Sequence, residues 1–142
     1  MKLLLDSLEL KRFKRKASKA YPREIFAILL GKEIYDKRSK TFKIDQIVVP
    51  EIKESTVDYV IPDYNDIGRI VSESNLDYIG SIHTHPNSTP TLSEHDFRYW
   101  EKGEIVIGIL SIRKRNIKKM TELKFWRKNA SCPVKFKVIK NE

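Results

Sequence analysis

Apolar residues recur at helical spacing in two parts of the chain. Between residues 3 and 20 they return every three or four positions from Leu10 to Ala20, which predicts a helix over most of this segment, after a short strand at its start. Pro22 interrupts this helix, because proline disfavours helical backbone at the residue before it. Residues 63–75 show the same spacing and predict a second helix.

Strands are predicted where apolar residues run continuously or alternate with polar ones. Residues 24–31 are apolar almost throughout after Glu24, which indicates a strand buried on both faces, although a core helix segment gives a similar run. Residues 33–35 and 41–49 flank the turn-like segment 36–40 and predict a hairpin. Further strands are predicted at residues 56–61, 76–82, 104–112, 123–126 and 134–139.

These elements, together with a helix from Glu94 to about Lys102, predict an α/β or α+β fold with a central mixed sheet and helices packed against it. The 142 residues fit one domain spanning 1–142 and are enough to bury a core. No apolar run approaches the roughly 20 residues of a membrane span, and Asp6 breaks the apolar start too early for a signal peptide. The single cysteine, Cys132, excludes an intrachain disulfide and a cysteine-rich zinc site. We therefore expect a cytoplasmic protein.

The formal net charge of +9 is concentrated in two basic clusters, at residues 11–19 and 113–119. One interpretation is attraction to nucleic acid or to an acidic partner. The other is a solvated helix face and a charged turn, because the basic residues of the first cluster fall opposite Leu10, Phe13 and Ala17. We favour the second interpretation, since charge alone is a weak signal for nucleic-acid binding.

All three histidines, a carboxylate and a hydroxyl lie within the fourteen residues from His83 to Asp96. His83 and His85 follow a predicted strand, and residues two apart on a strand point to the same face. Two neighbouring imidazoles are the start of a transition-metal site. A loop braced by Pro86 and Pro90 can return Asp96 to them, which gives three nitrogen and oxygen ligands and an open position.

Each part of this pattern, taken alone, has a purely structural explanation. Ser93 and Asp96 match a capping box at the start of the predicted helix, with apolar residues placed for a hydrophobic staple. An isolated His-x-His pair belongs more often to packing or to the surface than to a metal site. The combination favours metal binding by His83, His85 and Asp96, whereas His95 is expected to be a surface residue.

The segment His83-x-His85-x7-Ser93-x-x-Asp96 resembles the signature of the JAMM (MPN-plus) metalloproteases at every spacing. The resemblance covers most of the chain, from about residue 8 to residue 112. Because no other Cys/His cluster exists for a second zinc, the compact prokaryotic or archaeal form of this family is the better comparison.

An upstream glutamate completes the resemblance. Glu24 follows a Tyr-Pro pair at 21–22 and precedes an apolar run that ends at Gly31, which is similar to the glutamate element of the family. The chain departs from the family at Ala27, where glycine is usual, and at Leu92, where proline is common. Both departures concern loop shape rather than the ligand set.

The resemblance implies a cytidine-deaminase-like α/β fold and a zinc-dependent hydrolase that cleaves isopeptide or peptide bonds to ubiquitin-like modifiers. It implies one zinc ion per chain, held by His83, His85 and Asp96. Glu24 would act as general base and then acid, and Ser93 would lie beside the developing oxyanion. Zinc lowers the pKa of a bound water to about 7, and proton transfer by a positioned carboxylate contributes about 10²–10⁴-fold, so these roles are chemically consistent.

Two other functions stay open. The motif fixes the reaction and not the leaving group, so a related zinc amidase or peptidase acting on short peptides or carrier-protein adducts is the alternative. A non-catalytic nucleic-acid-binding or scaffold module is less favoured. The expected partner is a conjugate of a ubiquitin-like protein, whose extended tail would pair with a strand edge at residues 52–61, and no membrane is involved. The sequence leaves open a homodimer, and iron, manganese or cobalt in place of zinc.

Overall fold

The computed structural model describes residues 1–35, 38–94, 96, 103–113, 121–128 and 131–140. Within these ranges the chain forms nine strands and two helices. The strands are β1 (Lys2–Asp6), β2 (Phe26–Ile34), β3 (Thr41–Val48), β4 (Ile52–Ser55), β5 (Val60–Pro62), β6 (Asp77–Pro86), β7 (Val106–Ile112), β8 (Thr121–Arg127) and β9 (Lys135–Ile139). The helices are α1 (Ser7–Ala20) and α2 (Tyr64–Glu73).

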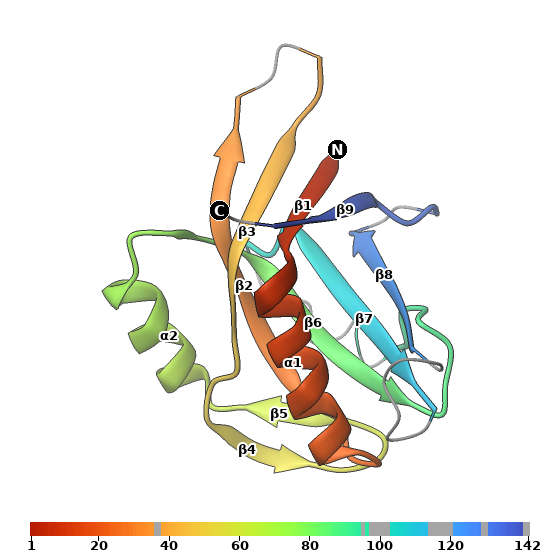
Figure 1. Ribbon diagram of the computed structural model, residues 1–142. Coiled ribbons are helices and arrows are strands. Elements are labelled where there is room, and N and C mark those ends of the chain that lie inside the picture. The colour runs from red at the N-terminus through yellow and green to blue at the C-terminus, as the bar shows by residue number, and fades with distance from the viewer. Residues whose placement is uncertain (36–37, 95, 97–102, 114–120, 129–130, 141–142) are drawn as a thin grey trace.

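Seven strands form one mixed sheet in the order β8-β7-β6-β2-β3-β1-β9, and β4 and β5 form a separate pair. β1 runs parallel to β3 and β9, and β6 runs parallel to β7, whereas the other neighbours are antiparallel. Figure 1 shows α1 across the front of this sheet, with the β4–β5 pair at the lower end of the molecule. The predicted α/β class with a central mixed sheet is confirmed.

Helix α1 covers one face of the sheet because its apolar positions fall on one side. Its start is capped by Asp6, whose carboxylate accepts a hydrogen bond from the backbone N–H of Glu9 at 3.0 Å. Leu10, Phe13 and Ala17 are buried in the main hydrophobic core. The helix ends just before the Tyr-Pro pair, where the sequence predicts its end.

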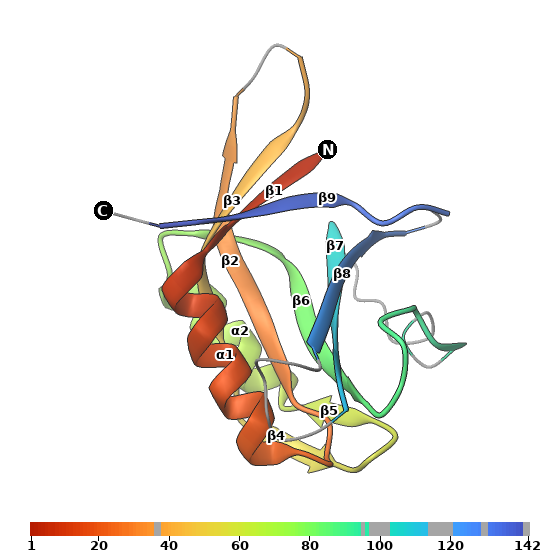
Figure 2. The ribbon, with the colours of Figure 1, turned by 45° about the vertical axis from the view of Figure 1, so that its right-hand side comes forward.

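Alternation along the central strands separates the two faces of the sheet. One set of residues joins α1 in the core, and the intervening set lines a cavity together with residues of α2. Figure 2 shows α1 in front of the sheet and α2 behind it. The core-facing set includes Ala27, Leu29, Ile82 and Leu110, and the cavity-facing set includes Phe26, Ser81, His83 and Ile107. His83 and, two residues further along the same strand, His85 therefore lie on the face of the sheet away from α1.

Strand β6, which carries His83 and His85, lies near the centre of the sheet between β2 and β7. Gly80 lets β7 approach closely, because a Cβ atom at this position would lie 2.0 Å from the carbonyl oxygen of Val106. Pairing on both sides fixes the direction in which the histidines project. The site is thus built on an interior strand of the sheet rather than on an edge strand.

The predicted strand at residues 56–61 is confirmed only at Val60 and Ile61, which belong to β5, and is wrong at residues 56–59. The chain turns there, because the hydroxyl of Thr56 accepts hydrogen bonds from the backbone N–H groups of Asp58 and Tyr59, each at 3.1 Å. Such a local side-chain bond competes with strand pairing. Two short strands, β4 and β5, flank the turn and pair with each other.

Other predicted elements are reproduced with shifted ends. Residues 26–31 of the predicted segment 24–31 form a strand rather than a core helix segment, with Glu24 and Ile25 just before it. β2 continues to Ile34 in the predicted hairpin arm and pairs with β3. The predicted helix from Glu94 to Lys102 lies mostly outside the described residues, although Glu94 and Asp96 are helical. In the described part of the chain, no helix has the length and apolar character needed to cross a membrane.

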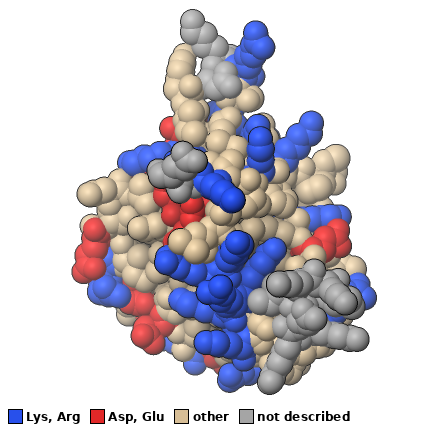
Figure 3. All heavy atoms as spheres, viewed as in Figure 1, with Lys and Arg blue, Asp and Glu red and all other residues tan. Residues whose placement is uncertain are grey.

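The first basic cluster lies on the outward face of α1, as expected for a solvated helix face. Figure 3 shows Lys and Arg side chains gathered over this helix. Within the described ranges, Arg12 is the one member of the cluster that forms an ion pair, with Glu9 at 3.0 Å. Of the second cluster, at 113–119, only Arg113 lies within the described residues.

Candidate metal centre

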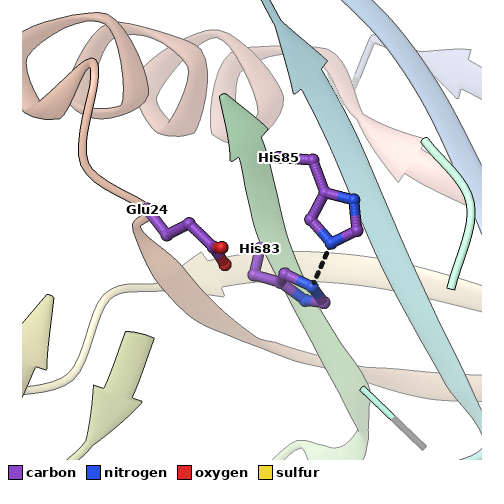
Figure 4. Close-up of side chains that lie close together, drawn as sticks. All are labelled: Glu24, His83 and His85. Atoms are coloured by element: carbon purple, nitrogen blue, oxygen red, sulfur yellow. Dashed lines mark hydrogen bonds between the residues drawn. The ribbon is translucent and has the colours of Figure 1, made fainter. Parts of the chain in front are cut away.

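Two imidazoles converge at the end of strand β6. His83 and His85 are separated by one residue and project from the same face of the strand, as Figure 4 shows. Their Nε2 atoms lie 3.1 Å apart, and both side chains are less than a tenth exposed. The lone pairs of two buried ring nitrogens at this distance repel each other unless a proton or a metal cation lies between them.

The backbone of the following loop fixes the orientation of His85. Its Nδ1 atom lies 3.0 Å from the carbonyl oxygen of Thr89, and a carbonyl only accepts hydrogen bonds. Nδ1 of His85 therefore carries the proton, and the lone pair of Nε2 points into the centre in the neutral ring. The loop itself is held by the indole N–H of Trp126, which donates to the carbonyl oxygen of Pro90 at 2.9 Å.

Asp96 closes the group from the start of the next helix. Its two carboxylate oxygens lie 2.8 Å from Nε2 of His83 and 3.2 Å from Nε2 of His85. The same carboxylate accepts a hydrogen bond from the backbone N–H of Ser93 at 2.7 Å, while the Ser93 hydroxyl accepts from the backbone N–H of Asp96 at 3.2 Å. The capping-box and ligand interpretations of Asp96 are therefore compatible, because the cap aims its carboxylate at the histidines.

Asp96 and the two histidines change one another's proton affinity. Burial disfavours the ionised form of Asp96, but hydrogen bonds with His83 and His85 outweigh it and hold the pKa of Asp96 well below its usual range. Burial also disfavours the charged form of His85, but its hydrogen bond and attraction to Asp96 outweigh burial and raise the pKa of His85. The carboxylate at position 96 is thus ionised, as a ligand must be.

Glu24 reaches the same place from the segment before β2. The register of the sheet pairs Phe26 with His83, so Glu24 enters beside the histidine strand. A carboxylate oxygen of Glu24 and ring nitrogens of His83 and His85 all lie within 4.8 Å of one another, and all three residues are buried. Figure 4 shows the Glu24 side chain pointing toward His83 from the neighbouring segment.

Burial gives Glu24 an unusual proton affinity. Loss of solvent raises its pKa to about 8, with repulsion from Asp96 and Asp58 adding to the rise and the positive form of His85 opposing it. A carboxyl group with a pKa near the working pH can both accept and return a proton. This is the property that the sequence analysis required of Glu24.

Two hydroxyl residues that the sequence analysis missed hold the Glu24 segment in place. The hydroxyl of Ser55 donates to the carbonyl oxygen of Glu24 at 2.5 Å, and the N–H of Glu24 donates to the carbonyl oxygen of Thr56 at 2.8 Å. The hydroxyl of Thr84, between the two histidines, accepts from the N–H of Ile25 at 2.9 Å. Thr84 could have been noticed as a polar residue in a buried strand, but nothing in the sequence points to Ser55.

The donor atoms suit a small transition-metal ion. Separations of 2.8–3.2 Å among the nitrogen and oxygen atoms of His83, His85 and Asp96 are close to the roughly 3.3 Å between ligand atoms of a tetrahedron with metal bonds of about 2.0–2.1 Å, as for zinc. Imidazole and carboxylate also suit iron, manganese and cobalt. Glu24 with the two histidines forms a second, overlapping donor set, but Asp96 is the carboxylate in direct contact with both rings.

Ser93 and His95 are the other two residues that the sequence analysis considered for this site. Ser93 caps the helix start and is exposed, so its role beside an oxyanion stays a prediction. His95 lies outside the described residues.

Comparison with known proteins gives a family and a fold. Residues 9–129 match the family model described as prokaryotic homologues of the JAB domain. No curated protein matches the chain. A solution structure of a Desulfitobacterium hafniense protein superposes with a TM-score of 0.79 at 14% identity, covering 98% of this chain and 94% of that one.

Two further solved structures are similar. The crystal structure of a JAB1/MPN domain protein from Archaeoglobus fulgidus gives a TM-score of 0.61 at 16% identity, covering 99% of this chain and 100% of that one. A solution structure of a Salinibacter ruber protein gives 0.63 at 20% identity, covering 100% and 92%. At these identities the structures show a shared fold.

Proposed function

The chain belongs to the prokaryotic homologues of the JAB domain, and from this premise we propose that it is a zinc-dependent hydrolase of isopeptide or peptide bonds formed by ubiquitin-like modifiers. The family includes metal-dependent isopeptidases but also members without activity, so the residues of this chain must carry the proposal. The observation that carries it is the convergence of His83, His85 and Asp96 within 3.2 Å, with buried Glu24 beside them.

His83, His85 and Asp96 would hold the metal, and Glu24 would stay unligated. A bound zinc ion supplies a Lewis acid and lowers the pKa of water at the open position. Asp96 is the better third ligand because it already contacts both histidine Nε2 atoms. In the neutral ring, the Nδ1 bond of His85 to Thr89 leaves the lone pair on Nε2, the nitrogen that would bind the metal.

Glu24 would carry the proton of the reaction. Its carboxylate takes a proton from the attacking water and returns it to the leaving amine, and its raised pKa of about 8 supports both steps. An amide needs this second step, because an unprotonated amide nitrogen is a poor leaving group. The Ser93 hydroxyl would donate to the oxyanion, since its hydrogen bond from Asp96 uses its oxygen and leaves its proton free to donate.

The position of β4 and β5 supports an extended substrate. They form a two-stranded sheet, so within the described chain each has one edge without a strand partner. Ser55 and Thr56 at the end of β4 bond directly to the Glu24 backbone, which brings this edge next to the metal centre. An extended tail could add to it as a further strand, which accords with the expected edge at residues 52–61.

Glu24→Gln tests the mechanism against a panel of ubiquitin-like proteins joined through their C-termini to a reporter protein. We expect the variant to bind zinc like wild type and to lose about 10²–10⁴-fold in hydrolysis, because the amide cannot shuttle a proton. The exposed Glu33 on β2 provides the matched control, and Glu33→Gln should cleave like wild type. Hydrolysis by Glu24→Gln at the wild-type rate would rule out this mechanism.

The same panel separates the substrate classes. Cleavage of short peptides or carrier-protein adducts but of no modifier fusion would favour the amidase or peptidase alternative. If zinc-loaded wild type cleaves nothing and nucleic acid binding persists in His83→Ala, the scaffold alternative would take its place.

A further inference from the structure

A cavity of about 290 Å³ adjoins the metal centre on the face of the sheet away from α1. Glu24, His83 and Asp96 lie at one part of its wall. The cavity extends beyond them between the central strands and helix α2. A substrate bond placed at the metal would therefore have this cavity directly beside it.

Most of the wall is apolar. Phe26 and Ile107 come from the sheet, Val60 and Pro62 from β5, and Ile67 from α2. An apolar cavity of this size beside a reaction centre accommodates one large side chain of a ligand, since burial of apolar atoms there removes them from water.

Polar groups interrupt the apolar wall, among them Ser81, Tyr78 and Glu104. Ser81 is 2% exposed and lines the cavity, where its hydroxyl oxygen can accept a hydrogen bond. The hydroxyl of Tyr78 donates to a carboxyl oxygen of Glu104 at 2.6 Å, and both residues line the cavity. Hydroxyl and carboxylate oxygens in an otherwise apolar wall favour a ligand group that can donate a hydrogen bond to them.

We infer that this cavity is a specificity pocket for the substrate residue next to the scissile bond, and that it takes a long aliphatic side chain with a hydrogen-bond-donating end, of the lysine type. The stem would lie against Phe26 and Ile67, and the donor end would meet the oxygen atoms of Ser81 and Glu104. The inference rests on the proposed function for its place beside the reaction, but its binding does not require hydrolysis.

Gly68 of α2 offers a direct way to fill the pocket. It lines the cavity, and a Cβ atom at this position would meet nothing within 4 Å. Gly68→Leu should therefore fold and even favour the helix, because leucine has a higher helix propensity than glycine. Ser72→Leu is the matched control, because Ser72 is an exposed residue of the same helix that does not line the cavity.

The experiment measures binding of three small amides to the zinc-loaded protein by NMR titration. The probes are the Nα-acetyl methylamides of lysine, norleucine and glycine. We expect the lysine probe to bind wild type about tenfold more tightly than the glycine probe and more tightly than norleucine, with shifts at Ser81 and Ile107. Gly68→Leu should abolish this preference and Ser72→Leu should keep it, while Ser81→Ala should bring lysine closer to norleucine.

Equal binding of the lysine and glycine probes, or the same affinities in Gly68→Leu and Ser72→Leu, would overturn the pocket. Norleucine binding as tightly as lysine would overturn the donor-end requirement. Loss of the proposed hydrolase function has a different signature, because wild type would then cleave no fusion while these titrations would still report on the pocket.

Discussion

At the scale of single residues, Asp96 explains why one sequence pattern supports two interpretations. Its carboxylate completes a capping box with Ser93 and contacts both histidine rings. A cap fixes the direction of the carboxylate through two backbone hydrogen bonds, and that direction is what a metal ligand needs. The structural and functional explanations therefore describe one arrangement rather than competing ones.

The buried titratable groups predict how stability of the metal-free protein depends on pH. The pKa of Glu24 rises from 4.5 to about 8 on folding, so the unfolded chain loses this proton first and stability falls as pH rises from about 4.5 to 8. The raised pKa of His85 acts with the same sign, because its contribution is lost as pH rises through the folded value. The lowered pKa of Asp96 contributes stability that is lost only below its usual value of 3.8.

Urea denaturation in a chelator between pH 5 and 8 measures this dependence. We expect stability to fall with rising pH, with a slope of at most about 1.4 kcal/mol per pH unit for each group. Glu24→Gln removes one titrating group and should flatten the profile. Equal slopes in wild type and Glu24→Gln would contradict the raised pKa of Glu24.

Sequence spacing could predict that His83, His85 and Asp96 lie together, but not the hydrogen bonds that position Glu24 beside them. His83, His85 and Asp96 are joined by short local rules: strand alternation, a loop and a helix cap. Glu24 required the family resemblance, because its neighbour in space is 59 residues away in sequence, as shown by the bond between Ile25 and Thr84. Ser55 was missed for the same reason, since its partner is a backbone carbonyl on a distant segment.

At the scale of elements, β6 and the segment before β2 are tied by Thr84. Its hydroxyl accepts from the N–H of Ile25, its N–H donates to the carbonyl oxygen of Ile25 at 3.0 Å, and its side chain is fully buried. These two hydrogen bonds between Thr84 and Ile25 fix the position of Glu24, the neighbour of Ile25, relative to the two histidines that flank Thr84. The position of Glu24 thus depends on a residue that does not line the cavity.

Thr84→Val should expose this dependence. Valine keeps the shape but leaves the N–H of Ile25 without its side-chain acceptor, which should cost about 1–3 kcal/mol in the free energy of unfolding. Denaturant titration measures it, with Thr91→Val at an exposed position expected within about 0.5 kcal/mol of wild type. Similar stabilities for the two variants would show that the Thr84 hydroxyl does not hold these segments together.

The element that the sequence pattern misplaced lies beside the site. The apolar residues Val57 and Tyr59 favour a strand at 56–61, yet Val57 is 51% exposed at a turn. The Thr56 hydroxyl accepts hydrogen bonds from two backbone N–H groups of the turn. The spacing of apolar residues along the sequence does not reveal such a bond. The elements predicted well, such as α1 and β7, are those whose apolar pattern is matched by burial in the core.

At the scale of the whole molecule, the sheet lies between the basic surface of α1 and the candidate metal centre. The basic face of α1 lies on one side, and the candidate metal centre and its cavity lie on the other. Sheet order places the histidine strand near the middle, so ligands from β6 and from the helix start at Ser93 to Asp96 meet over a rigid base. A metal bound there joins segments that the fold otherwise connects through a loop.

Metal binding should therefore stabilise the whole fold and depend on Asp96. We expect one zinc ion per wild-type chain by elemental analysis. At a thousandfold excess over Kd, linkage gives about 4 kcal/mol, or a rise in Tm on the order of 10 °C. Asp96→Ala should lose most bound zinc and most of the Tm rise. Asp45→Ala, which removes a half-buried ion-pair partner of Lys43, should keep both.

Comparison with Glu24→Gln decides which carboxylate is the third ligand. If zinc is lost in Asp96→Ala and kept in Glu24→Gln, the ligand set is His83, His85 and Asp96, and Glu24 is free to carry a proton. The reverse result would assign the metal to Glu24, His83 and His85, the overlapping donor set. Asp96 would then be a helix cap alone, and a different group would have to move the proton. The two variants together thus test the ligand set before any substrate is known.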